Sequence, residues 1–558
     1  MLQRFLIGMI AGACLAAPPA PVILISIDTL RADHLSAYGY HRTQTPNIDS
    51  FAQHGTLFTS IECQIPLTLP SHTSLFTSTY PFENQVEENA ERVPAKVVTL
   101  ASVLKSNGYK TAAFIGSVFL ESEMGLDQGF EVYDSPFHFE AFEPLSGSMF
   151  LGGAGRNPAV RDRRDGALVL GAARRWLAAN RDAPAFVFVH LFDLHKPYDP
   201  HAAVPRRPGI SGYDTELAYV DQLFGTFKQA LIAGGWWDRS LVVLLSDHGE
   251  SLGEHGEDSH GYFIYESTLW VPLMFHWPAG TDYPARDGQP AGLIDVAPTI
   301  LDFLHLPAQP SFEGQSLLAK SQPRAVYSES VYTHDAFGWA PLRGLRMGGY
   351  KYIEAPRPEL YNLAADPHEQ NNLFGKDAAQ VRTLRGELKK LVAAHAPKQT
   401  ASPADISPRT RALLASLGYL SGGPRAHGSS AADPKDRLPE YRLYETAQTL
   451  LYNKRLNEAA ATLRQLLVRD PHNTLARRDL GGTYIEQHLY AKARTCFEQV
   501  LAVAPDDYMA QFELGIADKH LGLYKEALEH LQVACKVAPE AQQCRHELEE
   551  VEKKTPPK

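Results

Sequence analysis

The sequence VILISID, residues 22–28, is a nearly continuous aliphatic run that ends in a carboxylate. A run that is apolar on both sides is typical of a strand buried in a parallel sheet. The same character returns at residues 185–189 and 241–245, and helix-like stretches at 99–107 and 166–180 lie between these runs. Strands that alternate with helices predict an α/β fold with a largely parallel sheet.

Two acidic residues follow these expected strands directly. Asp28 comes after the run at 22–27, and Asp247 comes one residue after the run at 241–245. Ligands of parallel sheets bind beyond the carboxyl ends of the strands, so both side chains are expected at that edge. Taken alone, each Asp is more often a helix cap or a turn residue.

A short segment with several hydroxyl groups forms a further candidate site. Residues 66–77 read PLTLPSHTSLFT, and Pro70 suits the first turn of a helix. Thr68 is then expected at the helix N-terminus, where free N–H groups and the helix dipole favour a sulfate or phosphate. A hydroxyl in that position can act as a nucleophile when a metal assists it. The alternative, that Thr68 only caps the helix, stays open.

Histidines complete the set of candidate site residues. His248 directly follows Asp247, and His260 comes twelve residues later, beyond a Gly-rich loop. His195 lies in the segment HLFDLHKPY, residues 190–198, directly after another expected strand. A single histidine is usually structural. Loops that carry His or Asp at the ends of several expected strands favour one common site.

Motifs spread over residues 22–373 resemble the sulfatase family of the alkaline-phosphatase superfamily. They follow the family's order, at residues 28–33, 45–49, 68–77, 246–249, 349–353, 359–363 and 366–367. The resemblance implies an alkaline-phosphatase-like sheet between helices, over a catalytic domain at 21–310 and a subdomain at 311–422. It also implies a metal-dependent ester hydrolase or transferase.

The chain departs from the sulfatase pattern in two motifs. Sulfatases convert a Cys or Ser in C/S-x-P-S-R to formylglycine, whereas this chain has Thr68 at that position and His72 in place of the Arg. No formylglycine is therefore expected. Thr29 replaces the second of two paired aspartates. Residues 247–261 instead resemble the lipid-A phosphoethanolamine transferases, which use a Thr nucleophile and zinc.

These observations predict one divalent cation bound by Asp28, Thr68, Asp247 and His248. A ligand set that contains nitrogen favours Zn²⁺ or Mn²⁺, and Ca²⁺ or Mg²⁺ remain alternatives. We expect Thr68 to attack phosphorus and form a phospho-threonine.

The remaining histidines are expected to assist this reaction. His195 and His260 would bind equatorial oxygens, complete a second metal site or protonate the leaving group. His72 would replace the missing Arg as a contact to the anion.

Two other functions remain open: hydrolysis of sulfuric esters without formylglycine, and an inert scaffold that only binds proteins. The substrate class expected for the enzyme is a small-molecule, sugar or lipid ester.

The C-terminal part repeats with a period of 34 residues. Pro471, Pro505 and Pro539 share this spacing, as do the Leu-Gly pairs at 480–481 and 514–515. A 34-residue period with small residues where helices touch is typical of tetratricopeptide repeats. We expect about three repeats and a capping helix over residues 438–558, after a linker at 423–437. Such an array predicts a protein or peptide partner.

The ends and the composition of the chain bear on its location. Residues 1–20 hold Arg4, then an apolar run, then Pro18 and Pro19, which resembles a secretory signal. We therefore expect an exported protein, periplasmic or extracellular, with a membrane anchor at the N-terminus, such as a lipid on Cys14, as the alternative. A formal net charge of −11 argues against nucleic-acid binding. Cys535 and Cys544 are a candidate disulfide pair.

Overall fold

The computed structural model describes residues 19–137, 163–198, 204, 208–319, 324–395, 432–537 and 542–555. Residues 1–18, which make up most of the expected signal and include Cys14, lie outside this set. None of the helices in the described part of the chain has the length and hydropathy of a membrane span.

The expected parallel strands form the centre of a mixed sheet. Within the described residues this sheet has nine strands, in the order β4-β3-β5-β1-β6-β7-β2-β8, with β9 also paired to β2. The strands from β4 to β6 run parallel to one another, whereas β7 is antiparallel to both β6 and β2. Their bounds, in chain order, are β1 Val22–Ile27, β2 Thr56–Glu62, β3 Lys110–Phe114, β4 Val132–Asp134, β5 Ala185–Leu191, β6 Leu241–Leu245, β7 Trp270–His276, β8 Arg286–Asp287 and β9 Ala291–Gly292.

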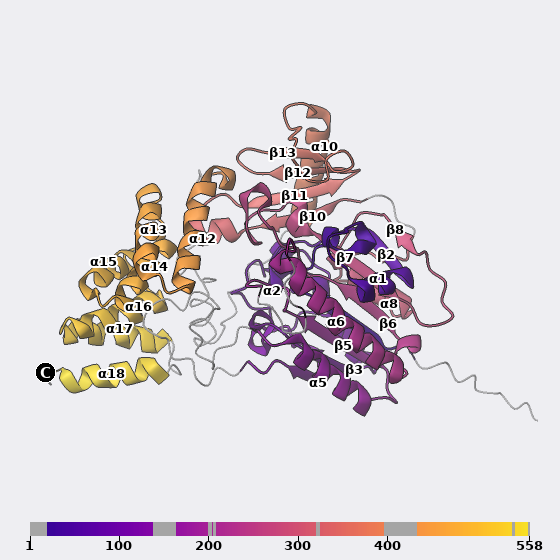
Figure 1. The fold of residues 1–558 in the computed structure, drawn as a ribbon, viewed down its shortest axis with the longest axis horizontal. Helices are drawn as coiled ribbons and strands as arrows, with labels where there is room; N and C mark the ends of the chain where they lie inside the picture. Colours follow the sequence, from indigo (N-terminus) through magenta and orange to yellow (C-terminus); the bar gives the residue numbers. More distant parts are fainter. Residues whose placement is uncertain are drawn as a thin grey trace, which may run out of the picture.

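Helices cover both faces of this sheet (Figure 1). Alternate residues of β1, such as Val22 and Ile23, enter two separate apolar cores, because successive side chains of a strand point to opposite faces. One core includes side chains of α2 (Thr68–Thr77), α4 (Leu100–Ser106) and α8 (Val296–Phe303). The other includes side chains of α1 (Pro46–Gln53), α5 (Gly166–Ala179) and α6 (Gly212–Ala233). Two short helices, α3 (Pro81–Asn84) and α7 (Glu266–Leu269), complete this domain.

A second, antiparallel sheet follows along the chain. Its strands are β10 (Val326–Ser330), β11 (Leu342–Met347), β12 (Tyr350–Glu354) and β13 (Glu359–Asn362). The short helix α9 (Tyr332–Phe337) follows β10, and α10 (Ala378–His395) packs on this sheet. The motifs noted above at 349–353 and 359–363 thus lie largely on β12 and β13.

The C-terminal helices form the expected array, drawn in orange to yellow beside the α/β domain in Figure 1. The repeat glycines lie where helices touch: a Cβ at Gly481 would come within 2.7 Å of the Phe497 ring. Cys535 and Cys544 form the disulfide considered above. The helices are α12 (Leu438–Tyr452), α13 (Leu456–Arg469), α14 (Thr474–Glu486), α15 (Tyr490–Leu501), α16 (Tyr508–His520), α17 (Tyr524–Val537) and α18 (Gln542–Lys554).

Part of the expected linker is ordered. Pro434–Arg437 forms a 3₁₀ turn, and Asp433 is buried with its carboxylate accepting the Arg357 N–H at 2.8 Å. The low apolar content of residues 423–437 suggested a linker, but polar side chains fix its C-terminal end. The rest of that stretch, up to residue 431, lies outside the described residues.

Candidate active site

Four side chains predicted to share a site meet at the carboxyl end of the parallel strands. Asp28 follows β1, and Asp247 and His248 follow β6, the strand paired with β1. Thr68 is the first residue of α2. Its Oγ1 lies 3.3 Å from Asp28 Oδ2 and 3.5 Å from His248 Nε2. All four side chains are buried, as expected for neighbouring parallel strands that end under a helix.

Thr68 is not a capping residue. The N-cap of α2 is Leu67, and no side chain caps this end of the helix. The Thr68 hydroxyl faces the Asp28 carboxylate instead. Ser71, on the same helix, donates from its Oγ to the Asp247 carbonyl at 2.6 Å and so ties α2 to the end of β6. Of the two interpretations of Thr68, the geometry favours the one in which its hydroxyl belongs to the site.

The carboxylates of the site fit a divalent cation. Asp28, Asp247 and His248 each offer a ligand atom, and these atoms lie within 4.8 Å of one another. Asp28 Oδ1 and Asp247 Oδ2 are buried without a hydrogen-bond partner, and among the described residues neither carboxylate pairs with Lys or Arg. Burial raises the pKa of Asp28 to about 6, and burial and then Asp28 raise the pKa of Asp247. A cation between oxygen and nitrogen ligands would offset this unpaired charge.

The hydrogen bonds around His248 fix which ring nitrogen can bind a metal. His248 Nδ1 lies 2.9 Å from the Gly249 carbonyl oxygen, which can only accept. Nδ1 therefore carries the proton, and Nε2 presents its lone pair toward Thr68 and Asp28. A backbone carbonyl that anchors the second nitrogen is the usual arrangement of a metal-binding histidine.

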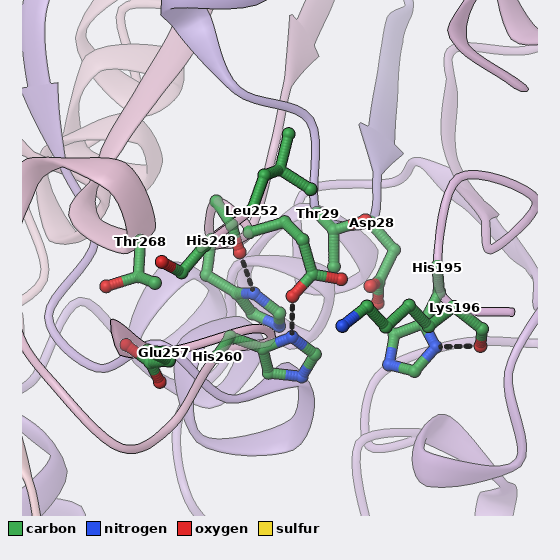
Figure 2. A network of polar contacts seen from close by, with 12 residues as sticks. Asp28, Thr29, His195, Lys196, His248, Leu252, Glu257, His260 and Thr268 are labelled. Atoms are coloured by element: carbon green, nitrogen blue, oxygen red, sulfur yellow. Dashed lines mark hydrogen bonds and ion pairs between the residues drawn. The ribbon is translucent and has the colours of Figure 1, made fainter. Parts of the chain in front are cut away.

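His195 and His260 are also held through Nδ1, and they come from two different loops (Figure 2). His195 Nδ1 donates to the Lys196 carbonyl at 2.7 Å, and its Nε2 is buried with no hydrogen-bond partner in the part of the chain that the structure describes. His260 Nδ1 donates to Glu250 Oε1 at 3.0 Å. The His260 ring centroid lies 4.3 Å from that of His248 and 5.2 Å from that of His195. The His260 ring thus lies beside both of the other two histidines.

The environment gives these groups different charge states. Burial holds the pKa of His195 well below its usual value, so that its ring is neutral at neutral pH. Burial alone would raise the pKa of Glu250, but His260 more than offsets this and lowers it to about 2. Glu250 is therefore an anion that accepts the hydrogen bond from His260 Nδ1.

His72 does not occupy the position expected of an anion contact. It lies one helical turn after Thr68, fully buried, with Nδ1 donating to the Thr68 carbonyl at 2.7 Å and Nε2 3.0 Å from Ser26 Oγ. Both ring nitrogens are therefore engaged behind the nucleophile. The expectation failed because residue i+4 of a helix hydrogen-bonds back into its own first turn. A cation in this part of the site is Lys196, which interacts electrostatically with Glu250.

Two site residues were missed by the sequence analysis, His190 and Glu250. His190 belongs to β5, its Nε2 lies 3.3 Å from Asp28 Oδ2, and neither ring nitrogen hydrogen-bonds to another described residue. It also lies with His72 and Asp247 in a second group of potential metal ligands. A histidine inside the aliphatic run of β5 was the available signal. No such sequence signal pointed to Glu250, because its contact with His260 arises only in the folded loop.

Backbone strain marks the same site. Thr29 has φ +56, although a β-branched residue rarely adopts this left-handed conformation. Its carbonyl accepts the Tyr213 hydroxyl at 2.7 Å, and the next N–H, of Leu30, donates to Ser246 Oγ at 2.9 Å. These bonds hold the turn that presents Asp28. Strained residues that the surroundings fix in this way cluster at functional sites.

Comparison with known families agrees with this geometry. The family model described as "Sulfatase" matches residues 21–306, slightly over half of the chain. A model described as "N-sulphoglucosamine sulphohydrolase, C-terminal" matches residues 253–396, and two tetratricopeptide repeat models match residues 450–512 and 483–542.

Curated relatives have low sequence identity to this chain, but the similarity extends over most of each protein. An ulvan-active sulfatase of Formosa agariphila is 23% identical, over 66% of this chain and 79% of that protein. Human arylsulfatase A is 24% identical, over 70% of this chain and 90% of that protein.

Solved structures share the fold. One, in complex with D-glucosamine-2-N,6-O-disulfate, superposes with a TM-score of 0.57 at 21% identity, over 68% of this chain and 98% of that one. A phosphonate monoester hydrolase of Agrobacterium radiobacter gives a TM-score of 0.54 at 23% identity, over 67% and 96%. The family model, the relatives and the strand-end site together assign this chain to the sulfatase family.

Proposed function

We propose that this sulfatase-family protein cleaves or transfers phosphate esters with Thr68 as its nucleophile. The observation that carries the proposal is the Thr68 hydroxyl, which lies 3.3 Å from Asp28 and 3.5 Å from His248 where sulfatases carry their modified residue. Oxidation of threonine gives a ketone rather than an aldehyde, because its Cβ bears a methyl group. The formylglycine mechanism is therefore not open to Thr68.

The site residues have different roles in the proposed reaction. Asp28, Thr68, Asp247 and His248 would hold a divalent cation, whose charge favours ionisation of the Thr68 hydroxyl. Thr68 Oγ1 attacks phosphorus in line, the bond from phosphorus to the leaving oxygen breaks, and a phospho-threonine forms. Lys196 binds the anionic oxygens.

The two loop histidines serve different half-reactions. His260, paired with the ionised Glu250, suits protonation of the leaving oxygen. His195, neutral with a free Nε2, suits removal of a proton from the water or alcohol that attacks the phospho-threonine. Water as the acceptor makes the protein a hydrolase, and an alcohol makes it a transferase.

A second candidate function is the hydrolysis of sulfuric esters. It is favoured by the names of the relatives, which include sulfatases from Formosa agariphila and human arylsulfatase A. The phosphonate monoester hydrolase among the structural neighbours supports the phosphorus chemistry instead. In either case we propose that the tetratricopeptide array binds a protein partner.

A side-by-side assay separates these functions. The purified chain, with divalent cation restored, is given an aryl phosphate monoester, an aryl phosphate diester and an aryl sulfate. We expect turnover of a phosphate ester that Thr68→Ala abolishes and Thr68→Ser, which keeps the hydroxyl, largely retains. Dominant turnover of the sulfate would contradict the proposal. No turnover, together with no bound metal, would support an inert scaffold.

A further inference from the structure

The loop between β6 and β7 carries Asp247, His248, Glu250 and His260, and its first part folds as one compact unit. We call residues 246–262 the catalytic loop. Its two sides are joined by the Ser251 N–H, which donates to the Ser259 carbonyl at 2.8 Å, and by the Gly253 N–H, which donates to the Glu257 carbonyl at 2.9 Å. Because these hydrogen bonds join the two sides of the loop, a displacement of its tip would also move His260.

The first helix of the tetratricopeptide array packs on the tip of this loop. Gly256 has φ +85, and a Cβ there would come within 2.8 Å of Arg442 Nη2 and 3.2 Å of Leu438 Cδ2. Both residues belong to α12. The absence of a side chain at position 256 therefore allows α12 to approach the loop backbone closely.

The same helix holds the end of the loop. The rings of Tyr262 and Tyr441 lie 4.1 Å apart between centroids, and the Tyr262 hydroxyl donates to the Pro434 carbonyl at 3.2 Å. Tyr441 is only 3% exposed. The buried Glu257 carboxylate accepts the Tyr262 N–H at 2.8 Å, which links this contact back to the tip of the loop.

This contact is part of the core rather than a loose junction between domains. Tyr441 belongs to the apolar core of the α/β domain, and Ala336, on α9 beside the second sheet, belongs to the core of the array. Lys435 forms an ion pair with Glu359 at 2.6 Å just before α12 begins. Glu445, one turn after Tyr441, interacts electrostatically with Lys196 on the other loop of the site.

We propose that α12 is a positioning element of the active site, with Tyr441 as its main positioning residue: it holds the catalytic loop so that Glu250 and His260 face Thr68. The role of this loop in catalysis rests on the proposed function. The packing of the loop does not, and it can be measured without a substrate.

Hydrogen–deuterium exchange on the full chain tests the positioning role. In Tyr441→Ala we expect peptides from residues 246–262 to exchange roughly tenfold faster, because the loop loses its packing partner. Tyr441→Phe, which keeps the ring, should match the wild type. Phe497→Ala is the matched control, since Phe497 is a fully buried ring on α15, in the array but not in contact with the loop. Should Tyr441→Ala not accumulate as folded protein, Tyr441→Leu takes its place with the same expected direction.

Two outcomes would overturn the proposal: unchanged exchange of the loop in the Tyr441 variant, or an equal increase in Phe497→Ala. Where the wild type turns over an ester, Tyr441→Ala should also lower kcat more than it raises KM and leave the metal content unchanged. Where no ester is turned over, the proposed function fails and the exchange measurement still decides the positioning role.

Discussion

The cluster around Lys351 and the cluster around Thr68 are both buried, but only the first contains its own cations. Lys351 lies 2.9 Å from Glu266 and 3.0 Å from Glu369, and Arg346 lies 2.8 Å from Glu62. These contacts join the second sheet to the end of β2 and to α7. Around Thr68, by contrast, two carboxylates face each other, and their ion-pair partners among the described residues are histidines.

Burial raises the pKa of carboxylates in both clusters, and the clusters differ in whether a Lys or Arg opposes that rise. Burial alone would lower the pKa of Lys351, but Glu266 and Glu369 raise it above its ordinary value, so the cation is retained. Asp28 and Asp247 have raised pKa values because of burial, and no Lys or Arg in the described residues offsets it. A paired cluster contributes to the fold, whereas an unpaired one is arranged for a ligand.

Asp247→Asn should show the largest difference between the two clusters, in turnover, bound metal and stability. It removes a carboxylate that the site uses for its cation, so we expect turnover to fall on the order of 10³-fold or more and bound metal to be lost. The free energy of unfolding of the metal-stripped protein should not fall, because an uncompensated buried charge is removed. Assays, elemental analysis and urea denaturation in chelator measure these three quantities. A large loss of stability in the metal-free protein would show that Asp247 is structural.

Lys351→Met is the converse change. It leaves Glu266 and Glu369 buried without their cation, and we expect a loss of about 3–5 kcal/mol in the free energy of unfolding. Lys390→Met is the matched control, because Lys390 pairs with Glu387 at the surface and should cost less than about 1 kcal/mol. Urea denaturation compares them. Equal effects would mean that the Lys351 cluster does not hold the two sheets together.

Glu250→Gln tests whether this carboxylate acts through His260. The amide still accepts the Nδ1 hydrogen bond but carries no negative charge beside His260, so kcat should fall roughly 10- to 100-fold with KM nearly unchanged. The ratio of kcat to KM effects is the readout, and metal content serves as the control. If KM rises instead and kcat is retained, Glu250 contacts the substrate rather than orienting His260.

A smaller effect is expected in the pH dependence of stability. Burial and then Glu266 raise the pKa of Glu62 to about 7; burial and Glu266, against the opposing Lys351, raise that of Glu369 to about 8. Because the folded pKa is raised, this stabilisation is complete below pH 4.5 and is lost as pH rises toward 8. Glu369→Gln should flatten this decline by about 1 kcal/mol per pH unit.

The measurement is a series of urea denaturation curves between about pH 5 and 8. Glu354→Gln, on the same strand as Lys351 but outside the cluster, should leave the slope as in the wild type. If Glu369→Gln leaves the pH dependence of the free energy of unfolding unchanged, a group other than Glu369 is responsible for it.

Much of the fold was predictable because its signals are local. The run at 22–27 is buried on both faces as β1, and Asp28 follows it at the carboxyl end of the sheet. The 34-residue period gave the helices of the array and the close contact at Gly481. Strand order and the antiparallel β7 were not predictable, since they depend on long-range pairing that no short window records.

The site was predictable only in part, for the same reason. Asp28, Thr68, Asp247 and His248 each stand beside a recognisable element end, and the structure brings them together. His190 was hidden within the run of β5. The roles of His72 and Tyr441 depend on which partner lies opposite, and spacing along the chain does not carry that information.

The central claim, that Thr68 is a phosphoryl acceptor, is tested most directly by mass spectrometry of the peptide that contains it. The metal-loaded protein is mixed with an aryl phosphate, quenched in acid and digested. The account predicts that this peptide gains the mass of one phosphoryl group on Thr68, and that Asp247→Asn lacks the adduct. Turnover of the phosphate ester with an unmodified Thr68 peptide at every quench time, and with Thr68→Ala still active, would contradict it.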